Sequence, residues 1–179
     1  MSDKQKTNFK IKDIIIDHNQ PCKIFKITKR KPARIFFKPY PTPKNDNNLI
    51  SSIPIDNIDK AFIRKPINKK RVKKLLKTLS QNIHPKPKSD TNNTTKNKIK
   101  LLSCYNPFDS VELIKILLIK KSGKNTNYPT SNEKDFQTCI QNLAKEIAVV
   151  KKSSFQKEKA NLMSIIKKIK IIKPSVSNK

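Results

Sequence analysis

The stretch NKKRVKKLLKTLS (residues 68–80) is where the chain changes from strand-like to helical periodicity. Its apolar residues recur at i, i+3, i+4 and i+7, which predicts a helix over about 69–80 with one apolar stripe (Val72, Leu75, Leu76 and Leu79). Asn68 can cap this helix at its N-terminus. The opposite face is nearly all lysine, and it fits either a solvated helix face or a nucleic-acid-binding patch.

Upstream of this helix, the chain carries short runs rich in isoleucine and phenylalanine, which are typical of β-strands. The expected strands are Phe9–Ile16, Lys23–Thr28, Arg34–Phe37 and Leu49–Ile53. The stretches between them are rich in Pro and Asn, which mark turns. The pattern predicts a small antiparallel barrel or curled sheet that ends with the helix, so that residues 1–80 form a first domain.

Downstream, residues 81–97 hold two prolines with Asn, Thr and Ser and almost nothing apolar, which is the composition of a linker. A helical period follows, and capping pairs indicate three helix starts: Asp109 with Glu112, Thr130 with Glu133, and Ser153 with Gln156. We therefore expect an α+β protein with a helical domain over 98–172 and a disordered tail at 173–179.

The charge of the chain is strongly positive along its whole length. It has 41 Lys and Arg against 13 Asp and Glu, a formal net charge of +28. Residues 1–80 hold 21 basic and 6 acidic residues, which leaves 20 and 7 in the remainder, so the two parts carry +15 and +13. Such self-repulsion favours a polyanionic partner, with nucleic acid as the first expectation.

The sequence offers little for catalysis. Three cysteines (Cys22, Cys104 and Cys139) lie far apart with no C-x-x-C pair, so neither a zinc site nor any other metal or cofactor is expected. A single glycine excludes a P-loop. His18 lies near Asp13 and Asp17 but has no nucleophile partner, and we expect a surface residue rather than a general base. No enzyme is predicted.

No apolar run approaches a membrane span, and the first ten residues lack the apolar segment of a secretory signal. These features favour a cytoplasmic, nucleoid-associated protein without membrane contact, and we expect it to be a monomer.

Three stretches, in this order, resemble the CarD family of bacterial RNA polymerase-binding regulators. FKIKDIII (residues 9–16) is similar to the family's opening strand, and IPIDNIDKAFIRKPI (residues 53–67) to the segment before its first helix. TSNEKDFQTCIQNLAKEIA (residues 130–148) resembles the family's Ser-x-x-Glu-Lys helix. The resemblance implies an N-terminal Tudor-like β domain, shared with the transcription-repair coupling factor, and a helical domain that contacts upstream promoter DNA.

The resemblance also implies which residues bind. The RNA polymerase β subunit would contact Lys29, Arg30, Lys31, Arg34 and Ser52, where Ser52 stands at a position that is commonly basic in the family. Double-stranded promoter DNA would contact Lys96, Lys98, Lys100, Lys120, Lys121, Lys124 and Lys134. Lysines there would hold phosphates rather than read bases.

One departure bears on mechanism. The family has a characteristic Trp ahead of the bundle, and this chain has no Trp; the aligned position is near Thr91. An apolar wedge at a base step is what props open a distorted duplex. Three hypotheses therefore stay open: a CarD-like regulator, a basic structural ribonucleoprotein or chromosome-associated protein, and a polymerase-binding module without promoter-opening activity.

Overall fold

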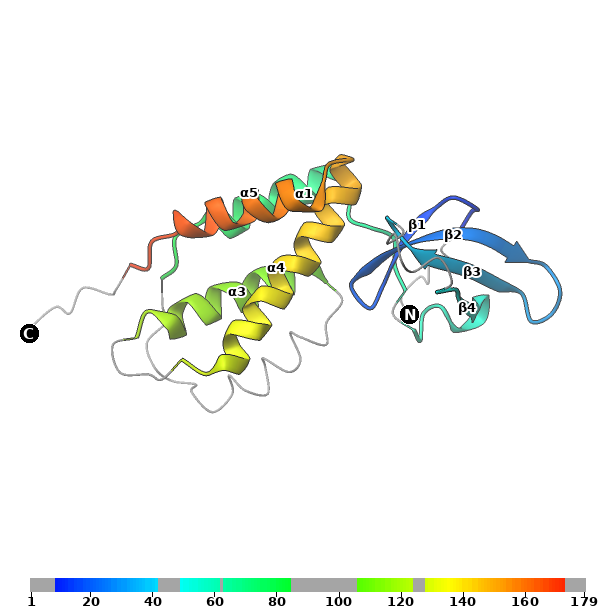
Figure 1. Ribbon diagram of the computed structural model, residues 1–179, viewed down its shortest axis with the longest axis horizontal. Coiled ribbons are helices and arrows are strands. Elements are labelled where there is room, and N and C mark those ends of the chain that lie inside the picture. The colour runs from blue at the N-terminus through cyan, green and yellow to red at the C-terminus, as the bar shows by residue number, and fades with distance from the viewer. Residues whose placement is uncertain (1–8, 42–48, 62, 85–105, 124–127, 173–179) are drawn as a thin grey trace, which may run out of the picture. The chain divides into compact units, whose positions relative to one another are not determined.

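The computed structural model describes residues 9–41, 49–61, 63–84, 106–123 and 128–172. The chain divides into two compact units, Met1–Pro66 and Ile67–Lys179, here called the sheet unit and the helical unit (Figure 1). Over the described residues, the first holds a four-stranded antiparallel sheet and the second holds four helices, so the predicted α+β class is confirmed.

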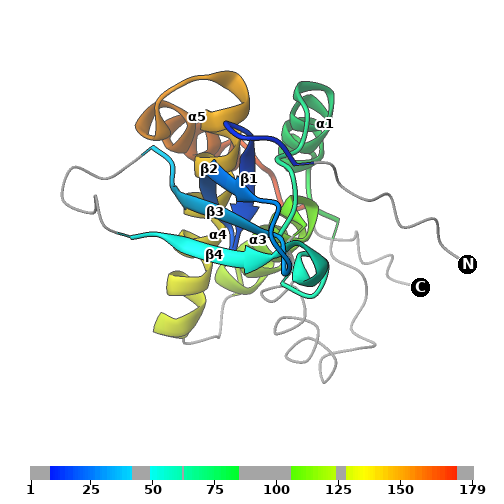
Figure 2. The ribbon, with the colours of Figure 1, turned by 90° about the vertical axis from the view of Figure 1, so that its right-hand side faces the viewer.

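The sheet unit has strands β1 (Ile14–Asp17), β2 (Gln20–Thr28), β3 (Arg34–Pro39) and β4 (Ser51–Pro54), followed by the short 3₁₀ helix η1 (Ile55–Asn57). The strands lie in sequence order and each is antiparallel to the next (Figure 2). One face of the sheet packs with residues that follow β4 into an apolar core, whose buried members are Ile15, Cys22, Ile24, Ile35, Phe37, Ile58 and Ile63. On the opposite face, Phe25 and Lys26 of β2 are exposed, whereas Ile16 of β1 and Pro21 of β2 are buried.

The described strands do not close into the barrel that the sequence predicted. The strand order places β1 and β4 at opposite ends of the sheet, and no described residues pair these two strands. The outer edge of β1 pairs instead with the segment before the helical unit, where the Ile16 N–H donates to the Arg64 carbonyl oxygen at 2.8 Å. Ile16 of that edge is therefore paired without closure of the sheet.

The turn between β1 and β2 is made without glycine. Its two central residues, His18 and Asn19, have φ values of 47° and 63°, as a two-residue hairpin turn requires. Asn tolerates this left-handed conformation better than most residues. The His18 ring also contacts the neighbouring Asp17 carboxylate, with Nδ1 and Oδ1 2.7 Å apart. These features explain how the chain makes this turn with polar residues.

The described residues of the helical unit form α1 (Lys69–Ser80), α3 (Pro107–Lys121), α4 (Thr130–Lys151) and α5 (Phe155–Lys167). The four helices share one apolar core, to which α4 contributes the longest stripe. The buried members of this core with no exposed surface are Leu75, Leu79, Leu113, Ile114, Leu117, Ile140 and Ala144. Each large side chain among them contributes roughly 1.5–3 kcal/mol through burial.

The first helix belongs to the helical unit, which corrects the predicted division at 81–97. Val72, Leu75 and Leu79 of α1 are buried in the same core as α3, α4 and α5. The chain just before α1 is held by α4, because the Ile67 N–H donates to the Glu146 carboxylate at 2.9 Å. Ile83, inside the predicted linker, is buried and bridges to Ile171. The rest of that linker from residue 85 and the predicted 173–179 tail lie outside the described residues.

The helix starts are predicted with mixed accuracy. The bounds of α1 and its cap are confirmed, since the Asn68 side chain accepts from the Arg71 N–H at 2.9 Å. The cap of α3 is Asn106 rather than Asp109, and the cap of α5 is Ser154 rather than Ser153. At α4, Pro129 precedes the helix and offers no side-chain cap. Ser153 instead serves a buried carboxylate at the same corner.

That carboxylate, Glu158, joins the end of α4 to the start of α5. Ser153 Oγ donates to Oε1 at 2.7 Å and Lys151 Nζ donates to Oε2 at 3.0 Å, and the residue is 3% exposed. Burial acts to raise the pKa of Glu158, but these two hydrogen bonds, the charge of Lys151 and a hydrogen bond from Asn161 together outweigh it, and the pKa is lowered from its usual value. The folded state therefore favours the charged form.

Because the pKa of Glu158 is lowered on folding, its contribution to stability is present above the ordinary glutamate pKa of about 4.3 and is lost as pH falls through the lowered value. We expect Glu158→Gln to destabilise the helical unit by about 1 kcal/mol at neutral pH. The expected loss shrinks at about pH 4 and below. Urea unfolding followed by helical circular dichroism at several pH values measures this; an equal loss at every pH contradicts it.

Candidate nucleic-acid interfaces

The β2–β3 hairpin is a cationic element. Residues 20–39 contain no Asp or Glu, and their seven basic residues are Lys23, Lys26, Lys29, Arg30, Lys31, Arg34 and Lys38. The two strands pair antiparallel over most of this length, so the seven charges are held close together on one hairpin. Such a density of charge of one sign creates a strongly positive local potential.

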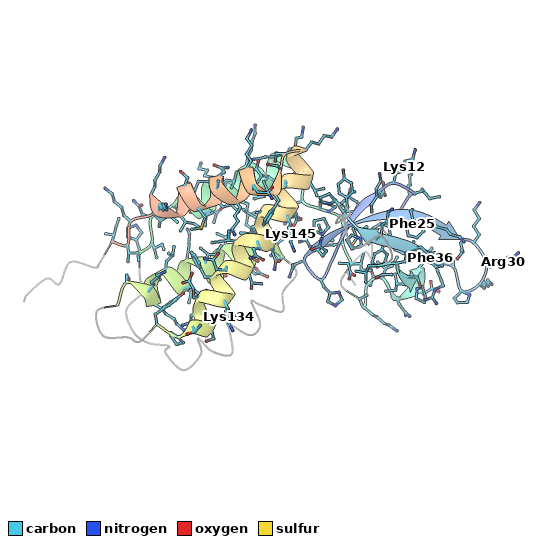
Figure 3. The ribbon with its side chains drawn as sticks, viewed as in Figure 1. Lys12, Phe25, Arg30, Phe36, Lys134 and Lys145 are labelled. Carbon is cyan, nitrogen blue, oxygen red and sulfur yellow. The ribbon has the colours of Figure 1, made fainter. Side chains whose placement is uncertain are left out.

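The structure brings together part of the predicted polymerase-binding set. Arg34 Nη2 donates to Ser52 Oγ at 2.9 Å across the β3–β4 pair. Lys29, Arg30 and Lys31 lie outside the strands in the β2–β3 turn, and all three are exposed. Figure 3 shows Arg30 at the end of the hairpin, away from the centre of the sheet. The predicted set therefore falls into an exposed hairpin tip and an Arg34–Ser52 pair on the sheet.

The solvent face of the sheet carries aromatic rings that the sequence analysis had not assigned to a site. The pairing of β2 with β3 shifts between Ile24 and Lys26, and this bulge leaves both Phe25 and Lys26 exposed. The Phe25 and Phe36 ring centroids are 6.4 Å apart, and Lys26 Nζ lies 5.6 Å from the Phe36 centroid (Figure 3). Two rings and a lysine thus form one contiguous cluster.

The exposed face of α1 is uniformly cationic. The helix contains no Asp or Glu, and its six basic residues are all exposed: Lys69, Lys70, Arg71, Lys73, Lys74 and Lys77. Within the described parts of the chain, none of the six forms an ion pair. Burial of the apolar stripe beneath them fixes the helix and keeps the charged side chains in solvent.

The surface predicted from the resemblance to bind DNA is less uniformly positive. Lys121 Nζ donates to Glu133 Oε2 at 3.2 Å, and the same ammonium lies 5.6 Å from the Tyr128 ring centroid. Lys120 is half-buried in the last turn of α3, whereas Lys134 is exposed near the start of α4. Of the predicted set, Lys96, Lys98, Lys100 and Lys124 lie outside the described residues.

The pKa of Glu133 is lowered, chiefly by the hydrogen bond from Gln137 and further by Lys121, although burial opposes the change. Glu133 is therefore charged at neutral pH and offsets the charge of Lys121. A phosphate approaching Lys121 would have to compete with this carboxylate. The α1 face has no described carboxylate in that position.

The two described thiols, Cys22 and Cys139, are unsuited to nucleophilic or metal chemistry. Burial, with a smaller contribution from Asp17, raises the pKa of Cys22 to about 12. Burial and then Asp135 raise the pKa of Cys139 to about 12 as well. A thiolate is the reactive and metal-binding form, so these two side chains behave as core residues. Cys104 lies outside the described residues.

The described residues contain no group of three or more His, Cys, Asp or Glu side chains placed to hold a metal ion. None of their helices has both the length and the apolar content that crossing a membrane requires.

The resemblance would place a Trp near position 91, and the aromatic residues nearest to that position in the sequence are Tyr105 and Phe108. Tyr105 lies outside the described residues. Phe108 is in the first turn of α3, where it packs against the helical core. The Arg71 guanidinium lies 5.6 Å from its ring centroid. A ring held between a core and a cation is not available to insert into a base step.

No protein-family model matches this sequence, and no curated protein is similar enough to count as a match. The α1 face and the β2–β3 hairpin, together with the quoted resemblance, are therefore the basis for assigning a function.

Proposed function

We propose that this chain is a CarD-like transcription regulator. Its sheet unit would correspond to the family's Tudor-like domain and dock on the RNA polymerase β subunit, and its helical unit would hold upstream promoter DNA. The protein would accordingly be nucleoid-associated. The single observation that carries the nucleic-acid part is the α1 face, with six exposed cations, no carboxylate in the helix and a packed apolar underside.

The order of the elements supports the same proposal. A four-stranded antiparallel sheet comes first and four helices follow, in the arrangement that the resemblance implies. Each unit has its own core and its own concentration of positive charge. A protein of this kind can hold two partners at once, and the linkage raises the effective concentration of the second partner.

Binding by α1 would be of the phosphate-contact type. Lysine ammonium groups act as point charges on phosphates and carry no sequence information, so affinity would depend on salt and hardly on sequence. The chain has no Trp to serve as a wedge, and Phe108 is packed. We therefore favour a regulator that binds polymerase and duplex without prolonging the lifetime of the open complex, because that needs contacts stronger with distorted DNA.

Polymerase docking can be tested at the hairpin tip. We expect the double variant Arg30→Glu, Lys31→Glu to reduce co-purification of the β subunit by about tenfold and leave duplex DNA affinity nearly unchanged, since a rim charge affects its own partner's association. The matched control is Lys10→Glu, Lys60→Glu, with the same charge change at two exposed positions of the sheet unit.

Quantitative pull-down and fluorescence anisotropy measure the two activities separately. Equal loss of both would indicate one diffuse basic surface and contradict a dedicated polymerase interface. Recovery of ribosomal subunits instead of polymerase would favour the structural ribonucleoprotein hypothesis.

A further inference from the structure

The solvent face of β3 alternates cations and rings. Because successive strand side chains point to opposite faces, Arg34, Phe36 and Lys38 share the face opposite the buried Ile35 and Phe37. Tyr40 follows at the next alternate position, and Lys23 Nζ from β2 lies 5.7 Å from its ring centroid. The order along the strand is therefore cation, ring, cation, ring.

The bulge in β2 adds a second row beside the first. Phe25 is 38% exposed and contacts Phe36, while Lys26 contacts the same ring from its own strand. Beneath them Ile24 and Ile35 have no exposed surface, so the rings stand on a packed core. The rings are held in place before any ligand arrives, which lowers the entropic cost of binding.

This combination of groups selects a ligand by its chemistry. The cations favour a polyanionic ligand, and the rings favour planar groups that can stack on them. In a duplex the bases already stack on one another and are not available to a flat sheet surface. The Phe25 and Phe36 ring centroids are 6.4 Å apart, roughly twice the ~3.4 Å rise of one strand in a duplex, so the spacing suits an extended strand with separated bases.

We propose that this face, formed by Phe25, Phe36 and Tyr40 with Lys23, Lys26, Arg34 and Lys38, binds single-stranded nucleic acid. Bases stack on the rings and phosphates contact the intervening cations. The four strands of the sheet carry a single acid, Asp17 in β1, and the face itself has none. The site is separate from the proposed duplex contacts of α1 and from Lys29, Arg30 and Lys31 at the hairpin tip, and it shares Arg34 with the predicted polymerase-binding set.

The absence of Trp from the chain makes a direct test available. In the full-length variant Phe25→Trp the indole is the only one in the protein, and stacking of a base on it quenches its fluorescence. We expect quenching by an oligothymidylate or an oligouridylate of about 12 nucleotides, and none by a duplex of equal length. Comparing the oligouridylate with an oligodeoxyuridylate of the same length shows whether the sugar matters.

Affinity measurements on ring variants test the stacking directly. We expect Phe25→Ala and Phe25→Leu each to weaken single-strand binding about tenfold, while Phe25→Tyr retains it, because one base stacked on an aromatic ring contributes on that order. Leucine keeps the apolar bulk and removes only the ring. Ile172→Ala, which alters a 42% exposed apolar residue of the helical unit, is the control and should change nothing.

The measurements separate this proposal from the proposed function. Charge reversal on α1 should weaken duplex binding and leave the quenching of Phe25→Trp in place. An unquenched indole in Phe25→Trp, or unchanged single-strand affinity in Phe25→Ala and Phe25→Leu, overturns the single-strand site. Loss of polymerase co-purification in Phe25→Ala, with oligonucleotide binding intact, would also overturn it by assigning the face to a protein partner.

Discussion

Replacing Leu75 with alanine is expected to destabilise the helical unit by about 2–5 kcal/mol and to leave the sheet unit unchanged. Leu75 has no exposed surface and lies in the core shared by α1, α3, α4 and α5. Truncation removes buried methyl groups and leaves a cavity that the surrounding helices can only partly fill. The size of the effect reflects a helix that is integral to this unit.

Hydrogen exchange resolved by peptide is the suitable measurement, because a chain of two units need not unfold in one step. Peptides from α3 and α4 should lose protection in Leu75→Ala, and peptides from β2 and β3 should not. Lys74→Ala, at the exposed neighbouring position of α1, should stay within about 0.5 kcal/mol of the parent. Loss of protection in the sheet alone would mean that α1 belongs with the sheet in the first domain, as the sequence predicted.

The helix itself was predictable, but its domain was not. The apolar spacing and the cap at Asn68 define α1 locally, and both the bounds and the cap are confirmed. Periodicity states that a helix has a buried stripe but not which partner covers the stripe. The partners of Leu75 and Leu79 come from α3, α4 and α5, far along the chain, and the polar segment after the helix suggested a boundary there.

The aromatic cluster was missed for a related reason. Short runs of Ile and Phe predict strands, and Phe25 and Phe36 were counted within such runs. Alternation alone would place the side chains of Phe25 and Lys26 on opposite faces. The bulge breaks that alternation and exposes both. The visible signal was the sequence RIFFKPY (residues 34–40), in which every second residue is a cation or a ring on one face.

The ion pair at Lys121 illustrates what a charge count leaves out. Lys121 and Glu133 are 12 residues apart, on different helices, and the fold sets their side chains 3.2 Å apart. Lys121 is predicted to contact DNA, but the Glu133 carboxylate offsets part of its charge. The charges of the α1 lysines are not offset in this way, because α1 carries no acid and the neighbouring helices contact it through the apolar stripe.

Reversing charge on α1 is expected to have the largest effect on duplex binding. The variant Lys70→Glu, Lys73→Glu, Lys77→Glu changes exposed positions only, and glutamate has a helix propensity close to that of lysine. Each reversed contact is expected to cost about 1 kcal/mol of binding free energy, so the three together cost ~3 kcal/mol and affinity should fall roughly 100-fold at low salt.

The salt dependence identifies the mechanism behind that loss. Each lysine that neutralises a phosphate releases condensed counterions, so a log–log plot of affinity against salt should become shallower by about 3 in this variant. Anisotropy with duplexes of two unrelated sequences, from about 50 to 200 mM salt, measures both quantities. Lys157→Glu, Lys167→Glu, Lys168→Glu makes the same charge change at exposed positions in and just after α5. A dedicated α1 site requires a much smaller loss in this second variant, because equal losses and slopes would mean that net charge alone holds the duplex.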